Sequence, residues 1–191
     1  MKRFKDLEIV GQDGELLAII ETISANLPSD WLRDTGAEER LAGISSEGKE
    51  AGFAFSREAK NDQPPCGLFL ARKSGRFYVS NIVPRESGEL TIDQYNSILD
   101  EFADILLRHL GAVDAPKLNV TSDQATITDW VSPEAAGLLK RFSTLANQST
   151  GSSHPLDFER WVAFLIQVHK ENSPIEVDNL IRWLVEGGLL R

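Results

Sequence analysis

Residues 66–110 constrain the fold more than any other part of this chain, because they give consecutive patterns for two strands and one long helix. Two apolar runs, residues 67–72 and 76–83, lie on either side of a Ser74-Gly75 pair. A Ser-Gly pair can take the positive φ angle that a tight hairpin turn requires. This stretch therefore predicts a β-hairpin that is followed by a helix.

The helix after the hairpin has a defined start and one apolar side. Thr91 and Gln94 have the spacing of a capping box, in which two side chains satisfy backbone amides at a helix start. Apolar residues then recur at steps of three and four, namely Ile92, Tyr95, Leu99, Phe102, Leu106 and Leu110. An apolar side of this length indicates a helix that covers a sheet.

The predicted fold class is α+β, with an antiparallel sheet covered by helices and followed by a small three-helix subdomain at the C-terminus. The covering helices are expected to begin near Asp13 and Thr91. The sheet is expected to contain the strands that carry Phe53, Phe69, Tyr78, Leu118 and Ile127. Residues 4–10 fit either a short strand or the lead-in to a helix, and residues 29–49 suit short helical turns.

The C-terminal part begins at a helix start, where Ser132 supplies a capping hydroxyl and Pro133 a favourable first residue. We therefore expect a sheet domain of residues 1–131 and a helical subdomain of residues 132–191, either separate or packed as one unit. Residues 158–168 are apolar around most of a helical circumference, which predicts a helix buried on more than one side. Residues 147–153 have the composition of a connector.

The last helix carries more apolar surface than its own packing requires. Its inner side is predicted to be Leu180, Ile181 and Leu184, with Trp183 beside it in a position compatible with partial exposure at an interface. Leu189 and Leu190 follow a Gly-Gly break. These two leucines either fold back on the chain's own helices or join Trp183 in a surface that another subunit or protein covers.

The charge balance narrows the range of partners. The formal net charge is −9 and the pI is about 4.9, which disfavours a nucleic-acid partner because phosphate binding needs clustered lysines and arginines. A basic protein partner fits this charge better. No apolar run reaches the roughly 18 to 20 residues that span a bilayer, and residues 1–6 do not lead into a signal-peptide core. With its single cysteine, the chain is expected to be cytoplasmic, with no membrane partner.

No motif specifies a reaction. The three histidines have no second histidine or cysteine at helical spacing, so neither a metal site nor a cofactor is predicted. Cys66 is expected to be a small residue at a strand start, although a base and a cationic setting would make it a nucleophile. Glu58-Ala59-Lys60 matches half of a nuclease signature without the aspartate strand that should precede it. Phosphate-binding, dinucleotide-binding and Gly-x-Ser-x-Gly patterns are missing.

The candidate partner-binding residues come from two regions. One is the acidic side of the central helix, which is either simply solvated or a docking surface for a basic partner. The other is the end of the chain. Together they are Asp93, Asp100, Glu101, Asp104, Trp183, Leu189 and Leu190.

The function expected from these features is non-enzymatic protein binding or regulation through docking on a partner protein. A small acidic α+β plan is similar in type to that of immunity proteins and antitoxins. The alternative is a small enzyme, for example a hydrolase, with a cleft between the sheet and the helical part. A homo-oligomer is compatible with both.

Overall fold

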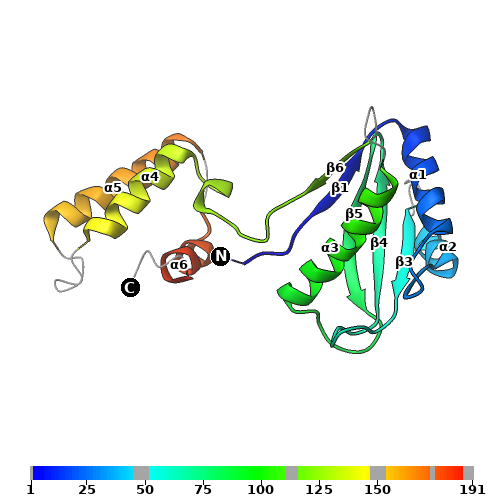
Figure 1. The fold of residues 1–191 in the computed structure, drawn as a ribbon. Coiled ribbons are helices and arrows are strands. Elements are labelled where there is room, and N and C mark those ends of the chain that lie inside the picture. The colour runs from blue at the N-terminus through cyan, green and yellow to red at the C-terminus, as the bar shows by residue number, and fades with distance from the viewer. Residues whose placement is uncertain (1, 45–51, 111–115, 147–153, 173–174, 187–191) are drawn as a thin grey trace. The chain divides into compact units, whose positions relative to one another are not determined.

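The computed structural model describes residues 2–44, 52–110, 116–146, 154–172 and 175–186. These residues form two compact units (Figure 1). Phe4–Asp123 make the sheet unit, and Met1–Arg3 with Gln124–Arg191 make the helical unit. Within the described residues, no helix is long and apolar enough to cross a membrane.

The sheet unit has an α+β fold, as the sequence predicts. Its strands are β1 (Leu7–Val10), β2 (Trp31–Arg33), β3 (Phe53–Arg57), β4 (Cys66–Lys73), β5 (Arg76–Pro84) and β6 (Lys117–Val120). Its helices are α1 (Asp13–Ala25), α2 (Thr35–Ile44) and α3 (Ile92–His109). The strands form one antiparallel sheet in the order β2-β3-β4-β5-β1-β6.

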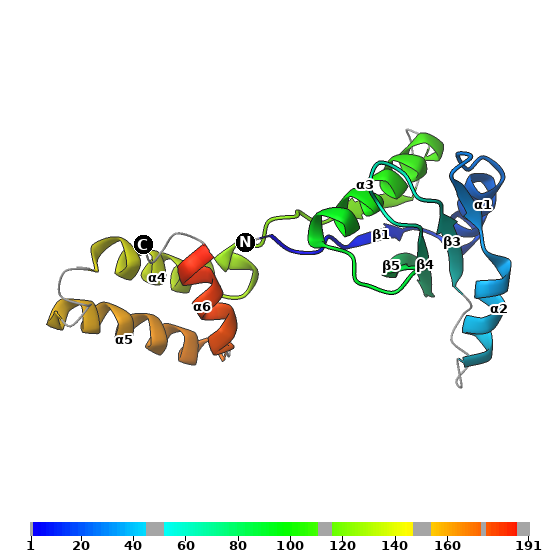
Figure 2. The same cartoon turned by 90° about the horizontal axis from the view of Figure 1, so that it is seen from below.

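The predicted hairpin and the two predicted covering helices are confirmed. β4 and β5 pair around a turn in which Gly75 has a φ of 72°, a conformation that costs glycine little. Thr91 and Gln94 form the expected capping box at the start of α3. Figure 2 shows α1 and α3 on the same side of the sheet, and the main core lies between them and the strands.

A β-bulge interrupts the pairing of β4 with β5. Phe69 lies opposite Asn81, but Leu70 lies opposite Val79, so Ser80 is an extra residue on β5. The Ser80 hydroxyl donates a hydrogen bond to the carbonyl oxygen of Phe69 over 3.1 Å. The bulge shifts the alternation of β5, so that Val79 and Ile82 both point into the core.

α2 lies at the β2 edge of the sheet and covers the outer side of β3 (Figure 2). A carboxylate oxygen of Glu38 accepts a hydrogen bond from the backbone amide of Ala54, and the Asp34 carboxylate accepts one from the Ser56 hydroxyl. Ala54 and Ser56 are consequently buried although they point away from the main core. The sequence indicated only short helical turns in this region.

In its described residues, the helical unit consists of a 3-10 helix, η1 (Ile127–Asp129), and three α-helices, α4 (Pro133–Leu145), α5 (Pro155–Lys170) and α6 (Val177–Glu186). The Ser132 side chain caps α4 by accepting a hydrogen bond from the amide of Ala135, as predicted. Phe142 of α4 and Phe164 of α5 belong to a second, smaller core, and the ring of Trp161 on α5 packs at a tilt against both.

One prediction about these elements is wrong. The predicted strand around Ile127 is η1, because the Asp129 carboxylate accepts a hydrogen bond from the Thr126 amide and closes a tight turn. The sheet instead gains β1 and β2. The chain divides between Asp123 and Gln124, whereas the sequence suggested a boundary at residue 131.

Candidate functional site

One side of β4 and β5 is not covered by any described element of the sheet unit (Figure 2). An antiparallel sheet with one side open to water usually carries polar residues there. This sheet instead places apolar or small residues at the centre of its open side. We call this set the uncovered face: Gly67, Phe69, Ala71, Tyr78 and Val83.

The apolar character of the uncovered face originates in β4. Leu68 and Leu70 point into the core. Because successive side chains of a strand point to opposite sides, the residues next to these two leucines point outward and are expected to be polar. Phe69 occupies that outward position and is only half-buried. Its ring lies over Gly67, since a Cβ atom added to Gly67 would lie 3.6 Å from the ring. Val83, opposite Gly67 in the register, is 40% exposed.

A hollow of about 330 Å³ lies between this face and α2. Phe69 and Val83 form part of its floor, and Asp34, Arg40 and Arg85 are among its polar residues. Arg85 forms an ion pair with Glu58 across 3.2 Å. The hollow thus combines an apolar floor with charged residues of both signs, which is the arrangement that protein-binding surfaces use.

A second hollow of about 310 Å³ lies farther along the same side of the sheet, over β5, β1 and β6. Here the Arg76 guanidinium lies 5.5 Å from the ring centre of Tyr78. The Glu8 carboxylate accepts hydrogen bonds from the Arg76 guanidinium and from the side-chain amide of Asn119. Tyr78 belongs to the uncovered face and also lines this second hollow.

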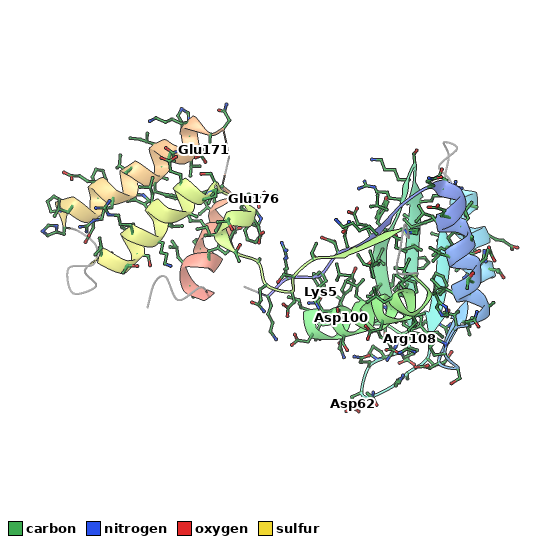
Figure 3. The ribbon with its side chains drawn as sticks, turned by 45° about the horizontal axis from the view of Figure 1, so that its top comes forward. Lys5, Asp62, Asp100, Arg108, Glu171 and Glu176 are labelled. Carbon is green, nitrogen blue, oxygen red and sulfur yellow. The ribbon has the colours of Figure 1, made fainter. Side chains whose placement is uncertain are left out.

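The four acidic residues that were predicted to form one side of α3 lie in different environments. Lys5 donates hydrogen bonds of 2.8 Å to both carboxylate oxygens of Asp100 (Figure 3). Glu101 binds three groups of the sheet unit, as described below. Asp93 and Asp104 are exposed. The structure therefore does not bring the four residues together as one open carboxylate surface.

Glu101 accepts hydrogen bonds from three side chains at one end of the sheet, of which Trp31 and Arg57 are buried and Lys60 is exposed. Arg57, which is 1% exposed, donates to Glu101 Oε2 over 2.9 Å. The Trp31 indole nitrogen and Lys60 Nζ donate to Glu101 Oε1 over 3.1 and 3.3 Å. A guanidinium that leaves water needs such a partner, because an unpaired buried charge is costly. The cluster therefore fastens β3 to α3.

Asp30 completes this cluster from the surface side. Lys60 donates a 2.6 Å hydrogen bond to Asp30. That bond lowers the pKa of the Asp30 carboxyl, and together with Glu101 it raises the pKa of Lys60. Both groups consequently stay charged at neutral pH, so neither is set up to exchange a proton in a reaction.

Cys66 lies beside this cluster, opposite Arg57 in the register. Burial raises the pKa of its thiol to about 11, so at neutral pH the nucleophilic thiolate is a minor species. His109 and His169 lie in the last turns of their helices, and His154 caps α5 by accepting a hydrogen bond from the Leu156 amide. Among the described residues, no group of histidine, cysteine and acidic side chains is arranged to hold a metal ion.

Trp183 occupies a different environment from the predicted one. It is 3% exposed, and its ring centre lies 4.2 Å from that of Trp130. Leu184 is also buried, whereas Ile181 is 53% exposed. The inner side of α6 therefore contains Trp183 and not Ile181. Steps of three and four from Leu180 lead to Trp183 and Leu184, which explains this outcome. Leu189, Leu190 and the predicted connector at residues 147–153 lie outside the described residues.

Sequence reasoning missed the uncovered face, although a signal for it was present. A strand buried on one side should alternate, but residues 66–71 are apolar or small without interruption. Such a run is typical of a strand that is buried on both sides. The sequence therefore contained evidence that the outer side of β4 is suited to contact.

Comparison with known proteins gives no further guidance. No family model, curated protein or solved structure matches this chain.

Proposed function

We propose that this protein acts by binding a protein of net positive charge, with the uncovered face as the docking surface. The observation that carries this proposal is the apolar outer side of β4, where Phe69 lies among small residues next to an exposed Val83. Apolar groups in such a position gain free energy when a partner removes them from water.

The distribution of charge supports a basic partner. Phe4–Asp123 contain 21 acidic and 12 basic residues, so the sheet unit holds the entire net charge of −9. A field of this sign attracts basic proteins over distances comparable to the Debye length of about 8 Å at physiological salt. The field accelerates encounter, and the apolar centre of the face then supplies contact.

Asp104 contributes to this attraction as an exposed carboxylate of α3. Asp100 and Glu101 contribute less, because cations of the chain itself lie against them. Docking then depends on the shape and apolar character of the sheet, and the acids of α3 serve to guide the partner.

The test compares substitutions on opposite sides of the same sheet. The full-length chain is used to isolate a binding protein from cells, and the dissociation constant is then measured with that purified protein. Val83→Lys should weaken binding by at least about tenfold, since it removes an apolar contact and repels a basic partner. Val83→Glu should weaken it less, because only the apolar contact is lost.

Val120→Lys is the matched control. Val120 is also a strand valine, with an exposed fraction of 39%, but it lies opposite Leu7 and therefore points to the α3 side of the sheet. The control should bind like the wild type apart from a small charge effect that disappears at high salt. Equal weakening by Val83→Lys and Val120→Lys would refute the uncovered face as the docking surface.

A further inference from the structure

α5 has an apolar side that faces away from its own core. Phe158 is 66% exposed, Leu165 43% and Ile166 49%, and Val162 between them is half-buried. These positions are separated by four, seven and eight residues, so they share one side of the helix. We call these four residues the α5 stripe.

The opposite side of α5 is already used. Phe164 is completely buried and Val168 nearly so, and both belong to the core that α5 shares with α4. The sequence of α5 predicts burial on more than one side, but a single chain provides it on one side only within the described residues. The α5 stripe thus has the composition of a buried helix surface, although its side chains are exposed or half-buried in the described residues.

α6 repeats this arrangement. Trp183 and Leu184 point inward, whereas Val177, Ile181 and Val185 are 68%, 53% and 61% exposed. The three exposed residues follow one another at steps of four and form the α6 stripe.

The apolar area of the two stripes approaches what a dimer requires. At roughly 100 Å² for each half-exposed large side chain, the six most exposed residues present on the order of 600 Å². A stable dimer covers about 800 Å² on each partner, and about 65% of a homodimer interface is apolar, or about 500 Å².

Charge favours a second copy as the occupant. The helical unit contains eight acidic and eight basic residues and is therefore neutral, so two copies meet through it without net repulsion. The sheet unit, with its charge of −9, opposes contact between copies through its own surface. A strongly charged partner would find no complementary field on the helical unit.

We infer that a second copy of this chain covers the α5 and α6 stripes, in a symmetric dimer in which the helical units face one another. In such an interface each copy presents the same surface, so the stripes of one copy pack against the stripes of the other. This inference does not depend on the proposed function, because it involves the other unit of the chain.

The first test is the molecular mass of the full-length chain, measured by sedimentation over a range of concentrations. The wild type should dimerise, and Phe158→Gln combined with Ile166→Gln should raise the dissociation constant of the dimer at least about tenfold. Leu107→Gln is the control, because Leu107 is 54% exposed on α3 of the sheet unit. A monomeric wild type, or equal weakening by the control, overturns the inference.

The second test measures protection of the stripe directly. Cys66 is the chain's single cysteine and is fully buried, so it should react little with a maleimide. The alkylation that is measured for Leu165→Cys is then that of the new thiol. Its alkylation should slow as protein concentration rises, whereas that of Leu107→Cys should not change. A rate for Leu165→Cys that is the same at all concentrations, whether fast or slow, overturns the inference. A slow constant rate would show that the chain covers the stripe itself.

Discussion

The sheet unit and the helical unit differ in how completely they bury their apolar residues. Of the large apolar side chains that are exposed in the described residues, nine belong to the helical unit of 71 residues and seven to the sheet unit of 120. The smaller unit thus leaves more of them in water. Surface grows relative to volume as a domain shrinks, so three short helices cannot enclose what a helix-covered sheet can.

The two units also differ in charge. The sheet unit is acidic and fixes its buried Arg57 with Glu101, whereas the helical unit is neutral. A charged unit remains separate from its own copies and attracts an opposite charge. A neutral unit with apolar stripes is suited to a partner like itself. One chain therefore carries two kinds of surface, for which we propose two different partners.

The largest expected effect compares the loss of a buried aromatic side chain in the sheet unit with the loss of an exposed one in the helical unit. Phe102→Ala should lower the free energy of unfolding by about 3 to 5 kcal/mol, since Phe102 is fully buried against Trp31 and Phe55 and truncation leaves a cavity. Phe158→Ala, on the α5 stripe, should change it by less than about 0.5 kcal/mol in the monomer. Urea denaturation at low protein concentration measures both. Similar losses would remove the contrast between core and stripe.

An intermediate effect concerns the charged cluster of the sheet unit. Glu101→Ala should cost about 3 kcal/mol, because it leaves the buried guanidinium of Arg57 without its carboxylate. Adding Arg57→Met should recover part of that loss, since the unpaired charge is then gone. A double-mutant cycle in urea measures the coupling. Additive losses would mean that the pair does not act as one buried unit.

The smallest effect is a pH dependence in the helical unit. The Ser132 hydroxyl and the Gln167 amide each donate a 2.6 Å hydrogen bond to Glu171, and these bonds lower the pKa of its carboxyl. The contribution to stability is therefore complete above the unfolded pKa of about 4.3 and is lost as pH falls through the lower folded pKa.

Hydrogen exchange, which resolves the two units, checks this expectation. Glu171→Gln should make the protection of α4 and α5 less dependent on pH below about 4.3. Asp30→Asn is the counterpart, because the bond from Lys60 lowers the pKa of Asp30 in the sheet unit. It should alter acid sensitivity there and leave the helical unit unchanged. The opposite pattern would contradict these assignments.

The sequence predicts the elements that rest on local signals. The Ser74-Gly75 turn and the capping box of Thr91 and Gln94 act within a few residues, so the hairpin and α3 occur where they are expected. The same holds for Ser132 at the start of α4. These signals do not depend on the rest of the fold.

Elements that depend on distant partners were not predicted. β2 and α2 contain Arg33 and Glu38, which read as solvated charges until the structure shows them bonded to each other beside Phe53. Arg57 follows Phe53 and Phe55 at a step of two, so the alternation of β3 already placed it inward. The carboxylate that makes this position tolerable, Glu101, is 44 residues away and no local pattern connects them.

The bulge at Ser80 has a consequence for how this chain tolerates change in length. Because Ser80 is one residue in excess, the segment after it is held out of phase with the segment before it. Removing that residue would restore regular alternation, in which Ile82 still points into the core and Val83 still points outward. Deletion of Ser80 should therefore keep the two faces of the strand end, whereas pairing Ser80 regularly in the ladder would exchange them. The outward position of Val83 therefore depends on Ser80 staying outside the regular pairing, and not on which side chain position 80 carries.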